Sequence, residues 1–416
     1  IIFIIHSIEF SCTRLLISDN IICSMKNIYL VLAISFLTCN TVFAQVTISG
    51  GSPAINGNYT TLTTAVTGAF AAINAGGSQA GYDILITINA DIVEPVTAGL
   101  LGGDWASLTI NPAGGAPRLV SANYNGALIN LAGVENVTID GLNTGGNALT
   151  ISNTSGTASA ITIRFANDAS DNMIVRCTLL GSSGALTAAS GLATIYFSSG
   201  ITTGNNYNTI TECNIAASAT GPARHAIQSS SIAAAPNINN TIFGNNIADF
   251  FHPAVFSGGI SLGAFNSDWN ISYNRLYQTA TRIATTGNTH TGILISSGSN
   301  YTITDNIIGF ANAAGTGTTN MTGVTSGALG GTFPGAFTTG TAVPNATRYN
   351  AIQCAFTAGG AVSSIQNNTI AGIALFTSSN ATGGTGILCG ITVSSGNANI
   401  GTVTGNTIGS AIGTSS

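Results

Sequence analysis

Apolar and polar residues alternate along this chain in short runs that recur about every 32 residues. One recurring pattern is Ile or Val, two residues, Asn or Cys, one residue, then Ile or Leu. Its central position, weakest in the first copy, falls at Leu142, Cys177, Cys213, Asn245, Asn274, Asn306, Asn368 and Asn406. The runs are short, rich in β-branched residues and separated by Gly, Asn and Ser, which is typical of strands and not of helical repeats. The pattern therefore predicts stacked β-coils.

A second apolar series precedes the first within each copy. It falls at Ile129, Ile161, Ile195, Ile227, Ile260, Ile293, Ile352 and Ile387. Both series stretch once, at the same place, between Asn306 and Ile352. Three short strands in a repeat of about 32 residues form one turn of a coil, and each strand then pairs with its equivalent one coil away at about 4.8 Å. We predict an all-β fold, a right-handed parallel β-helix (solenoid) with three short strands per coil and at least eight coils.

The central Asn or Cys is expected to lie at a sharp bend between two strands. Asn tolerates the left-handed backbone that such a bend needs better than other residues except Gly. Stacked Asn side chains can also pair along the axis through their amides. The pattern thus predicts a turn ladder that consists of Cys177, Cys213, Asn245, Asn274, Asn306, Asn368 and Asn406.

The two ends of the chain predict its organisation. Residues 1–24 precede the first methionine, Met25, and are interpreted as upstream read-through. Residues 25–44 are typical of a signal peptide cleaved after Ala44, and their apolar run is too short to span a bilayer. A lipoprotein cut before Cys39 is the rival interpretation, which the bulky Thr38 disfavours. We expect no transmembrane segment after signal removal.

Residues 45–125 are less regular and predict an N-terminal cap with one short helix over 62–73. Residues 126–416 predict the coils, with 309–350 as either a long loop insertion or a decayed coil. The last coil is followed by no visible cap, so we expect the C-terminus to be truncated.

The amino-acid composition limits the classes of partner that the protein can bind. Charged residues make up 6% of the chain, the net charge is −5, and 44% of residues are apolar. The apolar fraction is too high for disorder, and the lack of a basic patch predicts no nucleic-acid partner.

The repeats, together with the segment Asn136-Val137-Thr138-Ile139-Asp140-Gly141-Leu142, resemble the pectin-lyase-like right-handed β-helix superfamily. More narrowly, they resemble the large secreted β-helix surface proteins of Bacteroidetes, which often use type IX secretion and are mostly of unknown activity. The resemblance implies a bacterial protein that is secreted, extracellular or held at the cell surface. It also implies that any catalytic groove lies outside one strand ladder, lined by Asp, Arg, Lys or Glu.

Catalytic chemistry is not visible in that ladder. The residues one past each upstream Ile are uncharged: Asn130, Thr162, Tyr196, Gln228, Ser261, Leu294, Gln353 and Leu388. Glycoside hydrolysis usually needs two nearby carboxyl groups, and elimination from a polyuronate needs a base with charge stabilisation. We therefore expect no cofactor and a secreted structural or binding protein, adhesin-like, for polysaccharide, surface glycan or protein. The alternative is a carbohydrate-active enzyme, a polysaccharide lyase or glycoside hydrolase.

Aromatic residues supply the candidate glycan-binding positions, because sugar rings stack on exposed aromatic faces. The candidates are Phe250, Phe251, Tyr277, Phe310, Phe333 and Phe337. The competing interpretation is that these rings cover the ends of the core.

The remaining candidates involve charge and metal binding. Asp168 and Asp171 are a weak candidate pair of Ca²⁺ ligands, and a solvated polar turn is the favoured interpretation, because Asp is an ordinary turn residue. The three histidines at 225, 252 and 290 share no register in the repeat, so no metal site is expected. Arg176 and Glu212 occupy the same place in successive copies and predict a surface ion pair.

The four cysteines after the signal fall in two pairs one repeat apart. Cys177 with Cys213, and Cys354 with Cys389, are within reach of a disulfide if each pair is in register. Free buried thiols are the equal alternative.

Overall fold

The computed structural model describes residues 44–144, 146, 148–184, 191–381 and 386–409. The predicted read-through segment, and the signal peptide up to its last residue, lie outside the described residues. Within the described part, no helix is both long enough and apolar enough to cross a membrane.

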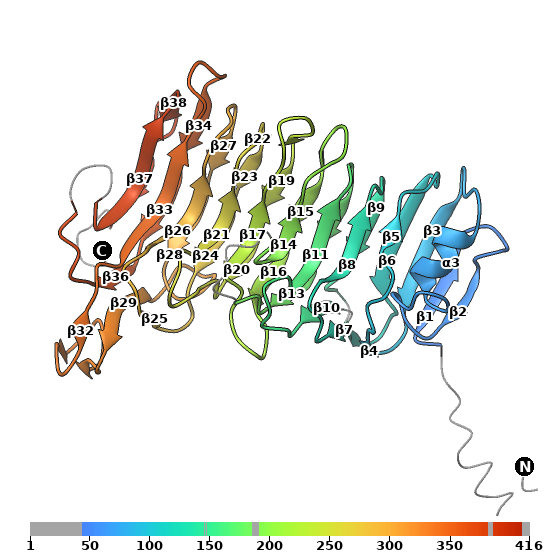
Figure 1. Cartoon of the computed structure of the whole chain (residues 1–416), viewed down its shortest axis with the longest axis horizontal. Coiled ribbons are helices and arrows are strands. Elements are labelled where there is room, and N and C mark those ends of the chain that lie inside the picture. The colour runs from blue at the N-terminus through green and yellow to red at the C-terminus, as the bar shows by residue number, and fades with distance from the viewer. Residues whose placement is uncertain (1–43, 145, 147, 185–190, 382–385, 410–416) are drawn as a thin grey trace, which may run out of the picture. The chain divides into compact units, whose positions relative to one another are not determined.

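Three long sheets run side by side along the described chain (Figure 1). Sheet 1 has twelve strands, in spatial order β2 (Gly57–Tyr59), β1 (Val46–Ser49), β3 (Asp83–Ile88), β6 (Ser107–Pro112), β9 (Val137–Asp140), β12 (Met173–Val175), β15 (Thr209–Thr211), β19 (Thr241–Phe243), β23 (Asn270–Ser272), β27 (Thr302–Thr304), β34 (Ser363–Gln366) and β38 (Ala398–Ile400).

Sheet 2 has ten strands: β39 (Thr407–Ile408), β35 (Thr369–Ala371), β28 (Ile307–Gly309), β24 (Arg275–Tyr277), β20 (Asn246–Ala248), β16 (Asn214–Ala217), β13 (Thr178–Gly181), β10 (Ala148–Asn153), β7 (Pro117–Ala122) and β4 (Ile92–Val93). Sheet 3 has nine: β37 (Leu388–Ser395), β33 (Arg348–Ala355), β26 (Thr289–Ile295), β21 (Gly258–Leu262), β17 (His225–Ser229), β14 (Ala193–Phe197), β11 (Ile161–Ala166), β8 (Ala127–Ala132) and β5 (Leu100–Leu101).

The chain visits sheets 3, 1 and 2 in turn, as β8, β9 and β10 do, and returns to sheet 3 with β11. Apart from the antiparallel contacts of β1, neighbouring strands in these sheets are parallel. The predicted parallel β-helix with at least eight coils is therefore confirmed. Its core is filled by stacked Ile side chains, such as Ile174, Ile210 and Ile242 in sheet 1, each fully buried.

The N-terminal cap and its helix are both shorter than the sequence predicts. The helix α3 covers only Ala69–Ala75, and Val66, inside the segment predicted to be helical, is 86% exposed. The segment before α3 instead wraps the buried carboxylate of Glu94, which accepts hydrogen bonds from the backbone N–H groups of Leu62 and Thr63 at 2.7 and 2.9 Å. Parallel pairing already begins at β3 and β6, so the coils start inside the segment predicted as a cap.

A ladder of buried amides closes the bend between sheets 1 and 2. In Asn274, Nδ2 donates to the carbonyl of Ile242 at 2.8 Å, and Oδ1 accepts the backbone N–H of Asn245 at 3.1 Å. The same contacts repeat at Asn306 and Asn368. Each amide thus satisfies one backbone carbonyl and one backbone N–H that the bend removes from sheet pairing.

The expectation that the ladder residue itself is left-handed is wrong. The positive φ lies one residue earlier, at Arg176, Glu212, Gly244, Tyr273, Asp305 and Asn367. The left-handed residue turns the chain and points outward, which leaves the next residue free to aim its amide along the axis. Two roles that the sequence analysis assigned to one residue are therefore divided between two neighbours.

Similar amides line the bend between sheets 3 and 1. Asn172 donates Nδ2 to Asn208 Oδ1 at 2.9 Å, and Asn208 donates to Asn240 Oδ1 at 3.1 Å. A parallel pair, Asn205 and Asn237, lies a few residues upstream at 3.2 Å. Sequence analysis missed these residues, although their spacing of 32 to 36 residues matches that of the first ladder.

The long segment before β33 is an insertion and not a lost coil. Strands β26, β27 and β28 pair directly with β33, β34 and β35, so all three sheets continue across it. The insertion supplies β29 (Thr319–Ser326), β30 (Gly330–Gly331), β31 (Phe337–Thr338) and β32 (Val343–Pro344). Strands β25 (Arg282–Ala284) and β36 (Ile373–Phe376), from loops on either side of it, pair with β29 outside the coil. A separate pair consists of β18 (Asn237–Ile238) and β22 (Asn266–Ser267).

The ladder predicts a large effect of Asn274→Ala. The substitution leaves the backbone N–H of Asn245 and the carbonyl of Ile242 buried without partners, and each such group costs roughly 1–3 kcal/mol. We expect the free energy of unfolding to fall by about 3 kcal/mol or more, measured by urea denaturation. The matched control is Asn246→Ala, whose side chain is half-buried and bonds only to Asn214. Equal destabilisation by both variants would show that the ladder has no special role.

Candidate functional site

Outward side chains of sheet 3 form a strip across its nine strands. The inward residues that share one register are Ile129, Ile163, Ile195, Ile227, Ile260, Ile293, Ile352 and Ile391. Two members of the predicted series, Ile161 and Ile387, are therefore out of register. The outward residues in those two coils are Arg164 and Thr392, and the prediction of Thr162 and Leu388 is wrong.

The error at Ile161 has a physical reason. Thr162 turns inward and donates its hydroxyl to the carbonyl of Leu180 at 2.7 Å. Ile161 lies on the outside, where it packs with Ala127 and Tyr196 in a small separate cluster. The strip that was predicted to be uncharged consequently carries Arg164, whose Nε donates to Asn130 Oδ1 at 2.7 Å.

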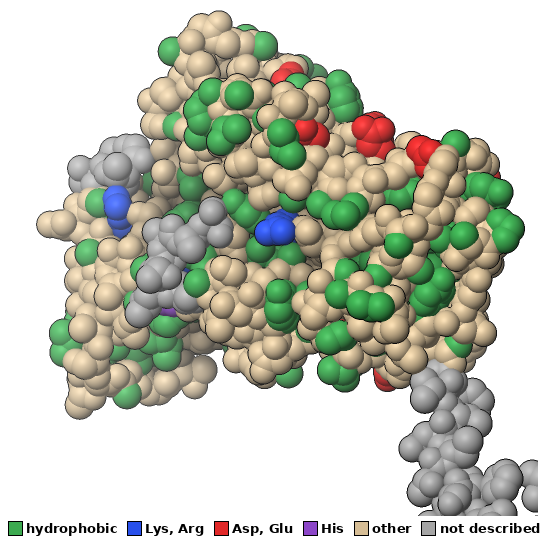
Figure 2. Space-filling view, turned by 45° about the vertical axis from the view of Figure 1, so that its right-hand side comes forward, with side chains coloured by type: hydrophobic (Ala, Val, Ile, Leu, Met, Phe, Trp, Pro, Cys, Tyr) green, Lys and Arg blue, Asp and Glu red, His purple; other side chains and the backbone are tan. Residues whose placement is uncertain are grey.

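Charges are separated around the coil. None of the described sheet 3 strands contains Asp or Glu, whereas Arg164 lies in β11, Arg348 in β33 and Arg224 directly before β17. Figure 2 shows acidic side chains gathered along the upper edge of one face, while basic side chains lie apart from them among uncharged groups. A chain with a net charge of −5 thus presents one face whose charged side chains, among the described residues of sheet 3 and the residue before β17, are all Arg.

Arg224 is a half-buried cation without a carboxylate partner. Its Nε donates to the carbonyl of Phe256 at 2.7 Å, and its Cζ lies 6.0 Å from the centre of that ring. Burial lowers the pKa of Arg224. The two ion pairs among the described residues are elsewhere, so this guanidinium has lost water without gaining an anion.

A pocket of about 350 Å³ opens next to Arg224. It is lined by Phe256, Gly287, Asn288, Thr289, Leu294, Arg348 and Gln353. Asn350, a buried residue of the same strand as the lining residues Arg348 and Gln353, donates Nδ2 to Gln353 Oε1 at 2.8 Å, whereas Asn350 Oδ1 has no partner. The hydroxyl of Thr291, in register with Asn350, is likewise buried without a partner. Unpartnered buried polar atoms beside a cavity are suited to bind a hydroxyl-rich ligand.

The three histidines lie closer together than the sequence analysis expected. His225 is in register with Gly258, and Gly258 with Thr291, so His225 and His290 are two coils apart on one sheet. Burial lowers the pKa of each to about 3, so both are neutral at pH 7. Within the described residues, no group of three His, Cys, Asp or Glu side chains is placed to hold a metal ion.

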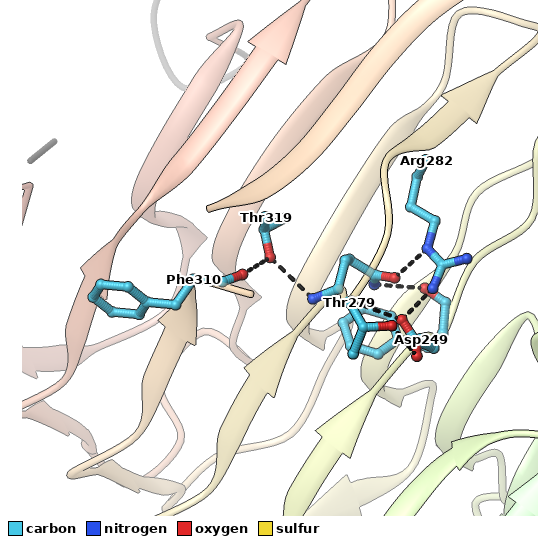
Figure 3. Close-up of polar contacts among 7 residues, drawn as sticks. Asp249, Thr279, Arg282, Phe310 and Thr319 are labelled. Carbon is cyan, nitrogen blue, oxygen red and sulfur yellow. Dashed lines mark hydrogen bonds and ion pairs between the residues drawn. The ribbon is translucent and has the colours of Figure 1, made fainter. Parts of the chain in front are cut away.

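A second polar cluster lies where the side strands join the coil. Figure 3 shows Asp249, Thr279 and Arg282 pointing toward one another. Arg282 also donates Nε to Gln278 Oε1 at 2.7 Å, and Thr319 links Gln278 to the carbonyl of Phe310. The network satisfies its own donors and acceptors, so it braces β25 and β29 against the coil instead of forming an open site.

The six aromatic residues predicted to bind glycan differ in their exposure. Phe250 and Phe251 are 4% and 6% exposed and belong to the main core, so their prediction as binding residues is wrong. They cover the core because the loop after β20 folds inward over it. Tyr277 and Phe310 are half-buried, and Phe310 lies at the edge of the cluster of Figure 3, where its carbonyl accepts from Thr319.

The inserted hairpin holds the other two predicted aromatic residues. Phe333 and Phe337 are half-buried and lie edge to face, with ring centres 5.1 Å apart. Phe337 also contacts Phe376 of β36, at 5.7 Å. Because these rings pack on one another, they hold the hairpin to the side strands.

The Asp168 carboxylate is already occupied. It accepts backbone N–H groups from residues 201–204 and the hydroxyl of Thr202, at 2.7 to 3.1 Å. Asp171 is exposed one bend away. The suggested Ca²⁺ site is therefore wrong, because Asp168 uses its lone pairs to hold a loop together.

The cysteines are free thiols. Cys177 and Cys213 are at equivalent positions of adjacent coils, where each thiol points to the carbonyl that an Asn amide bonds in later coils. The hydrogen bond to Cys213, with burial, raises the pKa of Cys177. A bridge between Cys354 and Cys389 is excluded by register, because Cys354 pairs with Val393.

The predicted ion pair of Arg176 has a different partner. Arg176 bonds Asp140 in the preceding coil, and Glu212 in the next coil acts on it only at longer range. The sequence identified the charged column but not the direction in which the guanidinium turns.

Arg224 and Arg348 were missed as site residues. A signal existed, because Arg164, Arg224 and Arg348 all fall within four residues of a sheet 3 Ile in the register that the structure shows. This signal is visible only when the strand register of sheet 3 is known, and the alternation of apolar and polar side chains does not define that register.

Comparisons with known proteins add little. No protein-family model matches the chain, and no curated protein is similar to it. Among solved structures, the chain is similar to a mannuronic acid specific polysaccharide family 6 lyase enzyme from human gut microbiota. The identity is 12%, the match covers 70% of this chain and 77% of that chain, and the TM-score is 0.29. At these values the likeness carries no argument about function, which must come from this chain's own side chains.

Asp168 predicts an acid-dependent contribution to stability. Burial acts to raise the pKa of Asp168, but hydrogen bonds from Thr202, Gly204 and Ile201 outweigh it and lower the pKa from 3.8 to about 2. The carboxylate therefore stabilises the fold above pH 3.8, and this contribution is lost as the pH falls through about 2. We expect Asp168→Asn to lower the free energy of unfolding at pH 7, with a difference from wild type that shrinks toward pH 2.

Chemical denaturation across this pH range measures the difference. Asp171→Asn is the matched control, because it removes a carboxylate three residues away that is exposed. A difference for Asp168→Asn that stays constant with pH would contradict the assignment.

Proposed function

We propose that the outer face of sheet 3 binds an acidic polysaccharide. The observation that carries the proposal is Arg224, a half-buried guanidinium with no carboxylate partner beside a pocket that Arg348 lines. An anionic group in this pocket would restore the interactions that Arg224 lost on burial. Arginine suits this role because its planar group binds carboxylates through paired hydrogen bonds.

The strip fits a polymer that runs across the strands. Arg164 and Arg348 are five strands apart, roughly 24 Å along the axis at the usual strand spacing, and Arg348 lies five residues before Gln353, the outward residue of the strip in β33. Between them the outward side chains are Tyr196, Gln228, Ser261 and Leu294. A chain of acidic sugars that crosses the strands obliquely would meet Arg164 at one end and Arg348 at the other, with hydrogen-bonding groups between them.

The pocket would hold one sugar of that chain. On the strands that carry its lining residues lie the hydroxyl of Thr291 and the amide oxygen of Asn350, which have no protein partner. Sugar hydroxyl groups both donate and accept, so they can satisfy these two atoms. Phe256 supplies an apolar wall, as is usual for sugar-binding pockets.

Cleavage of the bound chain is the second candidate function. The observation that favours it is a neutral imidazole, His225, one residue from Arg224. Elimination from an acidic sugar needs a base to remove a proton and a cation to stabilise the resulting negative charge. Binding is preferred because His225 is buried and its Nδ1 already accepts the backbone N–H of Gly258 at 3.1 Å.

The location of the protein in the cell is proposed from the predicted signal peptide and not from the fold. Residues 25–44 and the resemblance to Bacteroidetes surface proteins support a secreted or cell-surface protein, which we propose as the setting for polysaccharide binding. In this role the long β-helix acts as a rigid, adhesin-like module.

We expect Arg224→Ala and Arg348→Ala each to weaken the binding of a uronic acid oligosaccharide about tenfold or more, because a hydrogen bond to a charged group contributes roughly 1.5–3 kcal/mol. Isothermal titration calorimetry at low and high salt measures the affinity, which should fall with salt. Arg275→Ala, on the outer face of sheet 2, is the matched control and should bind like wild type.

A neutral oligosaccharide of the same linkage completes the design. Binding of the neutral chain with equal affinity would contradict the role of the arginines. Shortening of the acidic chain during the titration, detected by mass spectrometry, would establish elimination or hydrolysis in place of simple binding.

A further inference from the structure

The outer face of sheet 1 carries exposed aromatic side chains, on the side of the coil that the proposed function does not use. Tyr207, Phe243 and Tyr273 are 57%, 38% and 55% exposed, and we call these three residues the aromatic patch. They come from three successive coils: Tyr207 lies two residues before β15, Phe243 ends β19, and Tyr273 follows β23. The rings of Phe243 and Tyr273 are in contact, with centres 5.2 Å apart.

Two of these residues have an unfavourable backbone. Tyr207 and Tyr273 have φ angles of 56° and 58°, in the left-handed region. Equivalent bend positions elsewhere hold mostly Asn, Asp or Gly, which tolerate this conformation better than Tyr does. Their hydroxyl groups make no hydrogen bond to the described protein. Stability alone therefore does not account for Tyr at either position, and a surface role does.

A carboxylate accompanies each ring. Asp171 is one coil from Tyr207 at the same bend position, and its N–H donates to the carbonyl of Asn206 at 3.1 Å. Glu212 donates its N–H to the carbonyl of Phe243 at 3.1 Å. Asp305 is the bend residue one coil beyond Tyr273.

Few cations oppose these carboxylates. Arg176, one coil from Glu212, is already paired with Asp140. Arg275 begins β24 on the neighbouring sheet 2. The surface thus combines flat aromatic faces with negative charge, the opposite polarity to the strip on sheet 3.

We propose that the aromatic patch binds a glycan chain that contains amino sugars. The flat faces of sugar rings stack on Phe243, Tyr273 and Tyr207, and the protonated amino groups pair with Asp171, Glu212 and Asp305. Tyr207 and Phe243 are roughly 14 Å apart, four residues along a strand and one strand across. An oligosaccharide, and not a single sugar, is needed to contact both. The outward Thr209, Thr211 and Thr241 between them offer hydroxyl groups to the sugar.

The test uses a glucosamine hexasaccharide as the cationic probe and the N-acetylglucosamine hexasaccharide as its neutral counterpart, titrated into the whole protein. Tyr207→Asn and Tyr273→Asn place the residue that other left-handed bends use, so we expect both variants to melt at the wild-type temperature or higher. We expect each to bind the glucosamine chain at least tenfold more weakly. Glu212→Gln should weaken binding several-fold, and Tyr82→Asn, at an exposed tyrosine near the cap, should not change it.

Three results would overturn the proposal. The first is that the glucosamine chain does not bind, and the second is that the N-acetylated chain binds equally well. The third is that the protein self-associates in sedimentation and that Tyr273→Asn abolishes this association, because a second copy of the protein would then be the partner. Arg224→Ala and Arg348→Ala serve as independent controls and should leave glucosamine binding unchanged. The inference therefore stands or falls separately from the function proposed for sheet 3.

Discussion

The fold depends on satisfying backbone hydrogen bonds at the corners of each coil. Within the sheets, parallel pairing uses the N–H and C=O groups, but at a bend those groups lose their neighbours while still being buried. Asn274 and its equivalents replace the missing partners. The Nδ2 group of Asn274 donates to the carbonyl of Ile242 in the preceding coil, and Oδ1 accepts the backbone N–H and the side-chain Nδ2 of Asn245 in that same coil. The register of the coils, and hence the position of every outward side chain, follows from this contact.

The direction of these amide contacts is the same in each coil. The side-chain oxygen of each ladder Asn accepts the backbone N–H of the ladder residue in the preceding coil. The residues that donate in this way run from Cys213 to Asn368. Where Cys177 and Cys213 replace Asn, the thiol still points to the equivalent carbonyl, but a thiol is a weaker donor than an amide. The ladder is thus strongest from Asn245 onward, in the coils that flank the pocket of sheet 3.

Much of the architecture could be predicted because apolar alternation and corner chemistry repeat in every coil. The register of sheet 3 could not, since a shift of two or four residues preserves the alternation, as Ile161 with Ile163 and Ile387 with Ile391 illustrate. The site depended on that register, and Arg164 was overlooked for this reason. Burial of Phe250 and Phe251 depended on the path of a loop, which periodicity does not describe.

The division of each corner between two residues has an evolutionary consequence. The buried amide specifies the coil, whereas the left-handed residue before it, such as Arg176, Glu212 or Tyr273, only has to accept the backbone conformation. The column of outward corner residues can therefore change its chemistry step by step while the core stays the same. A β-helix of this kind can acquire a new binding surface without inventing a new fold.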